Sequence, residues 1–287
     1  MTNVLGPIKC SVQLDTLGRE CYMRQEGLYM YNDCVQVPPL QMIDDLASFS
    51  TCSPQSIITN AIINGKIEAK KLKFGSAKCI NLHIGENKSY CEGLKVHEET
   101  MKRKSHETYL GEVICSSGSN DKNIEKRRNF GIGAVSQMIS TLNRVTLGHF
   151  HFQIALIFRD SMLISKLLSS SETWYNVTDD QYRKLEEIDE MYLKKIFELP
   201  QSVPKLSLYA ECGRTPIKFL ILIRRLLFWW DILNKGNNEL VYKFFLAQQL
   251  RPVKKDYVLQ IKTDLDDIGW KITDDEVKTM SKLKFKK

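Results

Sequence analysis

The chain has 287 residues, of which 43% are hydrophobic and 26% charged, and its formal net charge is +7. That length and apolar content suffice for a packed core in one or two domains, and the charged fraction is ordinary for a globular protein. The modest basic excess favours polyanionic partners without demonstrating one.

The cysteines and the apolar stretches indicate in which cellular compartment the protein is expected. Eight cysteines form no CxxC pair and no zinc-spaced cluster with histidine, which favours free thiols in a reducing environment. Polar and turn-forming residues follow Met1, so no secretory signal peptide is expected. The most apolar stretch, residues 217–233, contains Arg224, Arg225 and Asp231, which are too costly for a bilayer span. We therefore expect an intracellular protein, in the cytoplasm or nucleus, with no membrane partner.

The first part of the chain, residues 1–115, has short apolar runs separated by Gly, Pro and Asn, a pattern typical of strands and turns. Two runs that meet at a pair of aspartates predict a β-hairpin over residues 40–43 and 46–49. A helix and then two strands are expected after it, over residues 56–72, 73–84 and 108–114. The helix is expected to turn four apolar side chains inward: Ile58, Ala61, Ile62 and Ala69.

The second part, residues 116–287, has helical periodicity throughout. Capping boxes mark the start of two helices, at Thr178 with Gln181 and at Thr273 with Glu276. The expected helices cover residues 121–142, 151–168, 179–197, 216–235, 239–250, 257–267 and a last one from 274. A frayed basic tail is expected at the end, with Lys282, Lys284, Lys286 and Lys287. The fold class expected is α+β: a small antiparallel sheet with helices, followed by an all-helical region.

Adjacent aspartates occur four times in the chain, and their context differs. Two of the pairs follow an expected N-cap threonine, where acids suit the helix dipole, and a third ends an expected helix before Gly269. Asp44 and Asp45 instead fall between two strand-like runs, at the tip of the expected hairpin. Carboxylates so close repel each other unless a cation lies between them, and such pairs hold Mg²⁺ in two-metal nucleotidyl transfer. A solvated turn explains the local pattern as well, since Asp is common in turns.

Several segments, in order along the chain, resemble one family. Residues 37–49, VPPLQMIDDLASF, resemble the catalytic hairpin of reverse transcriptases. Residues 5–20, LGPIKCSVQLDTLGRE, resemble the segment at the Gly-Pro element of non-LTR (LINE-type) retrotransposon enzymes, and residues 70–85 resemble their next palm motif. The tripeptide at 109–111, Tyr-Leu-Gly, resembles their primer-grip entry. Four further segments are similar to their thumb and connector: NFGIGAVSQM, ALIFRDSMLIS, ETWYNVT and TPIKFLILIRRLLFWWDIL.

The resemblance implies a fold, an activity and a set of site residues. It implies a partial palm over residues 1–115 and a helical thumb and connector over residues 116–287. The activity implied is that of an RNA-directed DNA polymerase, a nucleotidyltransferase acting with an RNA template and an RNA–DNA duplex. Asp44 and Asp45 are implied as catalytic residues and as ligands of Mg²⁺, and Lys78 as a substrate-binding residue near the phosphates of the incoming nucleotide.

The sequence also departs from the family. The family's first catalytic carboxylate lies upstream of the Gly-Pro element, and neither it nor the fingers has a counterpart in residues 1–287. We therefore expect a truncated reverse transcriptase that is inactive alone. Two alternatives stay open: a non-catalytic RNA- or DNA-binding helical module that uses the basic runs at 102–104 and 126–128, and a transposon remnant without function.

Overall fold

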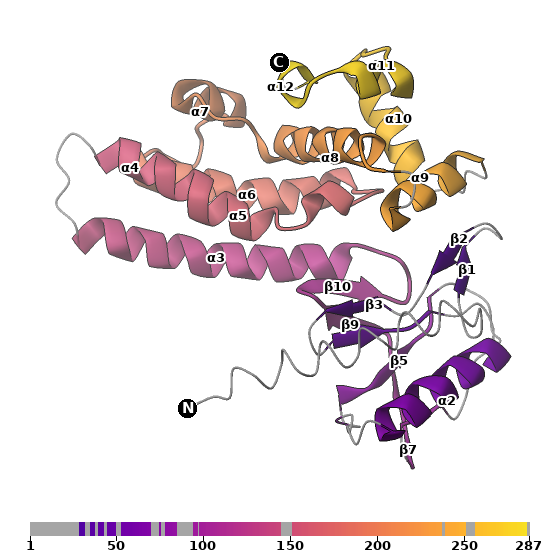
Figure 1. Cartoon of the computed structure of the whole chain (residues 1–287). Helices are drawn as coiled ribbons and strands as arrows, with labels where there is room; N and C mark the ends of the chain where they lie inside the picture. Colours follow the sequence, from indigo (N-terminus) through magenta and orange to yellow (C-terminus); the bar gives the residue numbers. More distant parts are fainter. Residues whose placement is uncertain are drawn as a thin grey trace. The chain divides into compact units, whose positions relative to one another are not determined.

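The structure, a computed structural model, divides into two compact units, Met1–Ser119 and Asn120–Lys287 (Figure 1). The first contains short strands and a helix, and the second is helical, so the expected α+β class is confirmed. The sequence pattern predicts a division after residue 115, and the units divide after Ser119. The described residues are 29–31, 35–37, 40–42, 45–49, 53–69, 75, 78–84, 94–96, 98–144, 151–236, 239–250 and 256–285.

The described strands of the first unit form five two-stranded pairs. In one of them β5 (Ile80–Leu82) runs parallel to β8 (Lys102–Lys104), which the long connection between the two strands permits. The expected single antiparallel sheet is therefore not what these residues form. The other pairs are antiparallel: β1 (Tyr29–Tyr31) with β2 (Val35–Val37), β3 (Leu40–Met42) with β4 (Asp45–Ala47), β6 (Lys95–Val96) with β7 (Glu99–Thr100), and β9 (His106–Tyr109) with β10 (Glu112–Cys115).

Helix α2 (Ser53–Ala69) of the first unit buries a face other than the one expected. Thr59, Ile63 and Ile67 are buried on successive turns. Asn60 and Asn64 on the same side both donate to the carbonyl of Lys95 on β6, at 2.6 and 2.8 Å. These two side-chain hydrogen bonds determine which face of α2 packs against β6. Of the side chains expected to point inward, Ile58, Ala61 and Ala69 are exposed and Ile62 is half-buried.

The second unit is a set of packed helices, and both capping boxes form as expected. One short helix is absent from the sequence prediction, although Pro204 before it and Gly213 after it, with a left-handed φ of 57°, mark its ends. None of the helices in the described residues is long and apolar enough to cross a membrane. The helices are α3 (Asp121–Arg144), α4 (His151–Phe158), α5 (Ile164–Leu167), α6 (Asp179–Ile196), α7 (Lys205–Cys212), α8 (Ile217–Leu233), α9 (Leu240–Leu250), α10 (Tyr257–Asp267), α11 (Asp274–Thr279) and α12 (Lys282–Phe285).

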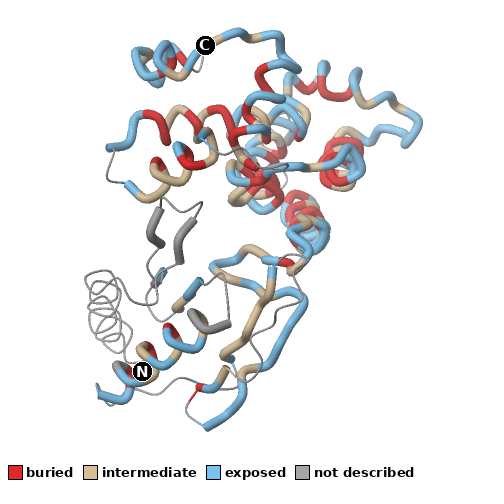
Figure 2. Tube along the Cα trace, turned by 90° about the vertical axis from the view of Figure 1, so that its right-hand side faces the viewer, coloured by how far each residue is buried: buried red, intermediate tan, exposed pale blue. Residues whose placement is uncertain are grey.

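The buried side chains of the second unit form two apolar clusters, and Figure 2 shows the buried stretches on its helices. The first cluster contains residues of the helices from α3 through α7 and of the start of α8. Helix α3 lies alongside α5 and α6 (Figure 1). The second cluster contains residues of the end of α8 and of the four helices that follow it, α9, α10, α11 and α12. Helix α8 therefore contributes to both, with Ile217 and Ile221 in the first cluster and Trp229 in the second.

A π-helical turn lies between α4 and α5, at Arg159–Leu163, where the sequence predicts uninterrupted helix over residues 151–168. Its first residue, Arg159, is 1% exposed and forms a bidentate ion pair with Asp189 of α6, at 2.8 and 2.6 Å. The hydroxyl of Tyr209 on α7 donates to the same carboxylate at 2.8 Å. Burial, and then the charge of Asp189, raise the pKa of Tyr209 above its ordinary value. The ion pair of Arg159 and Asp189 thus links the π-helical turn to α6, and Tyr209 adds α7.

The second buried arginine, Arg225 of α8, forms a matching bidentate pair with Asp264 of α10, both distances being 2.7 Å. It also donates to the hydroxyl of Tyr182 on α6 at 3.0 Å. Gln260 donates to Asp264 at 2.9 Å, and the hydroxyl of Tyr257 donates to the carbonyl of Arg225. This pair therefore connects the two apolar clusters through α6, α8 and α10.

Helical structure continues to Phe285, closer to the end of the chain than the sequence predicts. Residues 282–285 form α12, and Phe285 is buried against Trp229 and Trp270. Lys282 forms an ion pair with Asp231 at 2.5 Å and lies over the ring of Trp230. The prediction of a frayed tail is therefore wrong for these residues, because one aromatic side chain anchors the segment. Lys286 and Lys287 lie outside the described residues.

Close helix packing at Gly131 gives the first testable prediction. A Cβ added there would lie 2.6 Å from Cδ2 of Leu167 and 3.0 Å from Cγ2 of Ile188. We expect Gly131→Ala to lower the free energy of unfolding by about 1–3 kcal/mol, as overpacking of a core does. The matched control is Gly133→Ala on the same helix, where a Cβ meets nothing within 4 Å. That change should instead stabilise the protein by about 0.5–1 kcal/mol. Urea unfolding measures both, and equal midpoints would contradict the packing.

The second prediction concerns the buried ion pair. Asp189→Asn keeps the shape of the side chain but leaves the buried guanidinium of Arg159 without its main counter-charge. We expect a loss of about 3–5 kcal/mol in unfolding free energy, the usual cost of removing one partner of a buried pair. The control is Glu187→Gln, an exposed carboxylate on the same helix, which should change stability by less than about 0.5 kcal/mol. An Asp189→Asn protein as stable as the control would show that the pair contributes little.

Candidate active site and nucleic-acid-binding residues

A hairpin is present where the sequence predicts one, but its second strand begins at Asp45, so Asp45 lies in β4 and not in the turn. Strands β3 and β4 pair with Leu40 opposite Ala47 and Met42 opposite Asp45, so residues 43 and 44 connect them. A two-residue connection is the tightest common hairpin loop. Asp45 is exposed at the start of β4. Asp44, the other predicted catalytic residue and metal ligand, lies outside the described residues.

Tyr109 of β9 lies close to this hairpin. Its hydroxyl is 3.5 Å from the carbonyl oxygen of Leu40 on β3. Partial burial, and then the negative charge of Asp45, raise the pKa of the Tyr109 phenol above its ordinary value. The contact links residues 69 positions apart, so neither spacing nor periodicity could have indicated it. Only the resemblance singles out the motif at 109–111 in the sequence.

The strand predicted over residues 108–114 is instead a hairpin. Leu110 has a φ of 47° and Gly111 a φ of 89°, and these two residues connect β9 and β10. Positive φ at both central positions is what the hairpin turns that suit twisted strands require. Glycine adopts such a φ at no steric cost, whereas a leucine does not. Because Leu110 is apolar, it fits the alternation of apolar and polar residues that predicts a strand, and the turn was therefore not predicted.

Lys78, predicted to contact substrate phosphates, is exposed just before β5. Its backbone N–H donates to the carbonyl of Gly75 at 2.8 Å, which closes a tight turn. Among the described residues, no hydrogen bond or ion pair joins Lys78 to Asp45. The neighbouring thiol of Cys79 donates to the same carbonyl, and burial raises the pKa of that thiol. The structure thus does not bring Lys78 and Asp45 into contact.

The predicted Mg²⁺ needs oxygen ligands from several groups, usually carboxylates. Within the described part of the chain, no three His, Cys, Asp or Glu residues gather closely enough to hold a metal ion. Asp45 lies in the described part of the chain, and its neighbour Asp44 lies outside it. The described residues do not by themselves make up a magnesium site.

The two basic runs differ in their surroundings. Lys102, Arg103 and Lys104 of β8 are all exposed, and Lys104 forms an ion pair with Glu107. In α3, by contrast, Arg127 is 6% exposed and Lys126 lies over the ring of Phe130, 5.8 Å from its centroid. Residues 126–128 are therefore not a strip of exposed cations. The run in β8 presents three cations to solvent, an arrangement suited to phosphates of a nucleic-acid backbone.

Comparisons with protein-family models, with curated proteins and with solved structures give no match for this chain.

The β9–β10 turn gives a prediction for the first unit. Leu110→Asn should raise the unfolding free energy by about 1 kcal/mol, because Asn tolerates the left-handed conformation that costs leucine about 1–2 kcal/mol. Leu110→Ala is the matched control, since alanine bears the same backbone penalty as leucine. Thermal unfolding of both variants measures the difference. If the alanine variant gained as much as the asparagine variant, the gain would come from removing an exposed leucine and not from the turn.

Proposed function

We propose that this chain is the palm, thumb and connector part of a reverse transcriptase of the non-LTR retrotransposon type, and that alone it binds nucleic acid without polymerising it. The observation that supports the proposal is the β3–β4 hairpin, in which Asp45 is the first residue of β4 and pairs with Met42 of β3. The resemblance to the palm of reverse transcriptases implies that Asp44 and Asp45 lie at the tip of such a hairpin.

Two further features support the proposal. Tyr109, from the segment that resembles the primer-grip entry, lies against the hairpin as a residue near the reacting strand would. The helices of the second unit cover the segments that resemble a thumb and connector, and those segments supply core residues such as Gly131, Arg159 and Arg225. The short paired strands of the first unit, with α2, are what a partial palm would contribute.

In this proposal the role of each residue follows from its chemistry. Asp44 and Asp45 would hold Mg²⁺, and the bound ion would supply positive charge for a 3′-hydroxyl and for the leaving pyrophosphate. Asp45 offers an exposed carboxylate that can accept hydrogen bonds and attract a cation. Lys78 and the β8 cations offer positive charge that can bind phosphates. Residues 1–287 contain no match to the motif with the family's first catalytic carboxylate, so the proposed site is incomplete within this chain.

A second candidate function, nucleic-acid binding without a link to polymerase chemistry, is favoured by the exposure of all three cations of β8. Both candidates predict binding to an RNA–DNA duplex. They differ in catalysis once the missing motifs are supplied on a second polypeptide.

Binding is tested by measuring the affinity of the purified chain for an RNA–DNA duplex at several salt concentrations. Replacing Lys102, Arg103 and Lys104 by Ala should weaken binding and reduce the salt slope by about one unit for each phosphate that the protein no longer neutralises. The matched control replaces three other exposed lysines, Lys166, Lys262 and Lys271, and so changes the net charge equally. A slope that falls by the same amount in both variants would mean that overall charge, and not β8, drives binding.

Catalysis is tested by primer extension on an RNA template with Mg²⁺. The chain alone should extend no primer, because two-metal transfer needs carboxylates on both sides of the ions and residues 1–287 contain no match to the motif with the family's first catalytic carboxylate. Added polypeptide with the upstream motif and the fingers should restore extension, and Asp44→Ala with Asp45→Ala should abolish it again. Extension by the unaided chain that vanishes in the double variant would show that a further ligand is already present. Restored extension that persists in the double variant would remove Asp44 and Asp45 from the catalytic role.

A further inference from the structure

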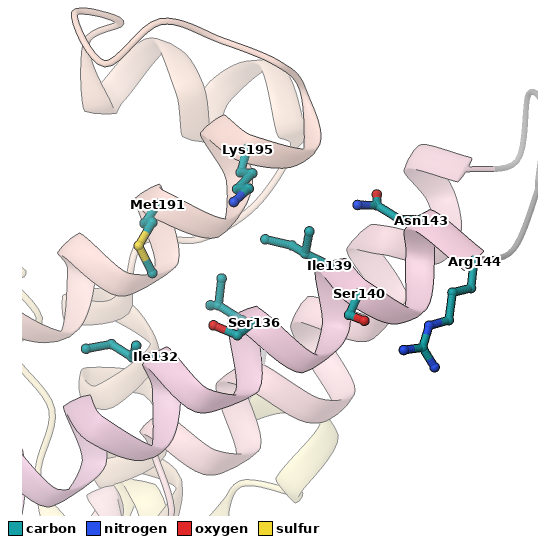
Figure 3. Close-up of a pocket in the computed structure, with 9 residues that line it drawn as sticks. Ile132, Ser136, Ile139, Ser140, Asn143, Arg144, Met191 and Lys195 are labelled. Atoms are coloured by element: carbon teal, nitrogen blue, oxygen red, sulfur yellow. The ribbon is translucent and has the colours of Figure 1, made fainter.

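A groove of about 540 Å³ lies between α3 and α6 in the second unit, and Figure 3 shows its lining. Its floor is apolar and comes from both helices. Polar and cationic side chains stand along its rim and at one end. The lining residues are Ile132, Val135, Ser136, Ile139, Ser140, Asn143, Arg144, Met191 and Lys195.

The shape of the groove suits a helix. Its lining on α3 runs from Ile132 to Arg144, a length of about 18 Å at 1.5 Å per residue, or somewhat more than three helical turns. The apolar residues at 132, 135 and 139 follow the i, i+3, i+7 spacing of a seam between packed helices. Ile132 is 37% exposed and Ile139 and Met191 are half-buried. A third helix laid along the groove would cover them and complete a three-helix arrangement with α3 and α6.

The charge of the groove restricts what that helix can be. Arg144 and Lys195 are exposed, and neither side chain has an ion-pair partner in the described parts of the chain. Other cations of α6 and α7 are paired, as Lys184 is with Asp180 and Lys205 is with Glu186. The lining includes no Asp or Glu. Figure 3 shows Arg144 at the end opposite Ile132, so the unpaired charge lies toward one end of an apolar seam.

We propose that this groove docks an amphipathic helix of a protein partner, with apolar residues along one face and carboxylates at one end. The apolar floor provides the area that such a helix buries, and the two cations set its orientation. A nucleic-acid backbone fits less well, because it requires repeated cations and offers nothing to cover Ile132, Ile139 and Met191. This partner site goes beyond the nucleic-acid binding and polymerase chemistry proposed above.

The test uses a fluorescent peptide of about four helical turns, with leucines at i, i+3 and i+7, two glutamates at one end and alanine and glutamine elsewhere. Fluorescence anisotropy with the full chain measures its affinity. Replacing both Arg144 and Lys195 by Glu should weaken binding about tenfold or more, since attraction becomes repulsion. The control Lys166→Glu with Lys262→Glu makes the same change in net charge elsewhere on the unit and should leave the affinity unchanged.

A second pair of variants tests the groove without changing charge. Ser140→Trp should fill the groove and abolish binding, whereas Gln137→Trp, on an exposed face of α3 outside the lining, should not. Circular dichroism verifies that each variant is folded. The proposal is overturned if the wild-type chain does not bind the peptide, or if a peptide with lysines in place of glutamates binds as well. It is also overturned if an RNA–DNA duplex displaces the peptide and loses affinity in the Arg144→Glu, Lys195→Glu variant.

Discussion

One buried guanidinium determines how the first cluster of the helical unit packs. Arg159 is nearly inaccessible to solvent, and its charge is matched by Asp189, which Tyr209 also contacts. A charge buried in an apolar core is tolerated only when its hydrogen bonds are satisfied, so the π-helical turn, α6 and α7 must keep the positions that supply them. Aliphatic cores in general tolerate repacking, whereas a bidentate ion pair requires one relative position of its two side chains. Arg225 and Asp264 place the same requirement on α8 and α10.

The two arginines are visible in the sequence, but their partners are not. Arg225 argues against a membrane span at the level of sequence, and the structure gives it a carboxylate 39 residues away. Helices with strong local signals could be predicted well, since Thr178 and Thr273 form the expected capping boxes. These features depend on residues within one or two turns of each other.

Prediction was poorer where long-range contacts decide the outcome. Helix α2 turns Ile63 inward and leaves Ile58 exposed because two asparagines bond to a distant strand. The β9–β10 turn was missed because Leu110 adopts a backbone conformation that its side chain disfavours. At the candidate site the β3–β4 hairpin followed from local pattern, whereas the proximity of Tyr109 depends on the fold of the whole unit. The local sequence therefore predicts where helices and strands form more reliably than it predicts which face of each one is buried.

The π-helical turn at Arg159–Leu163 has a consequence for how this segment can vary. A π turn accommodates one more residue than an α turn, and each residue rotates a helix by about 100°. Deleting one residue here would restore regular helix and rotate either Arg159 away from Asp189 or Leu163 out of the core. Deleting or inserting one residue in this stretch would therefore change which side chains of the helix face the core. Homologous chains that retain the ion pair should for that reason also retain the number of residues here.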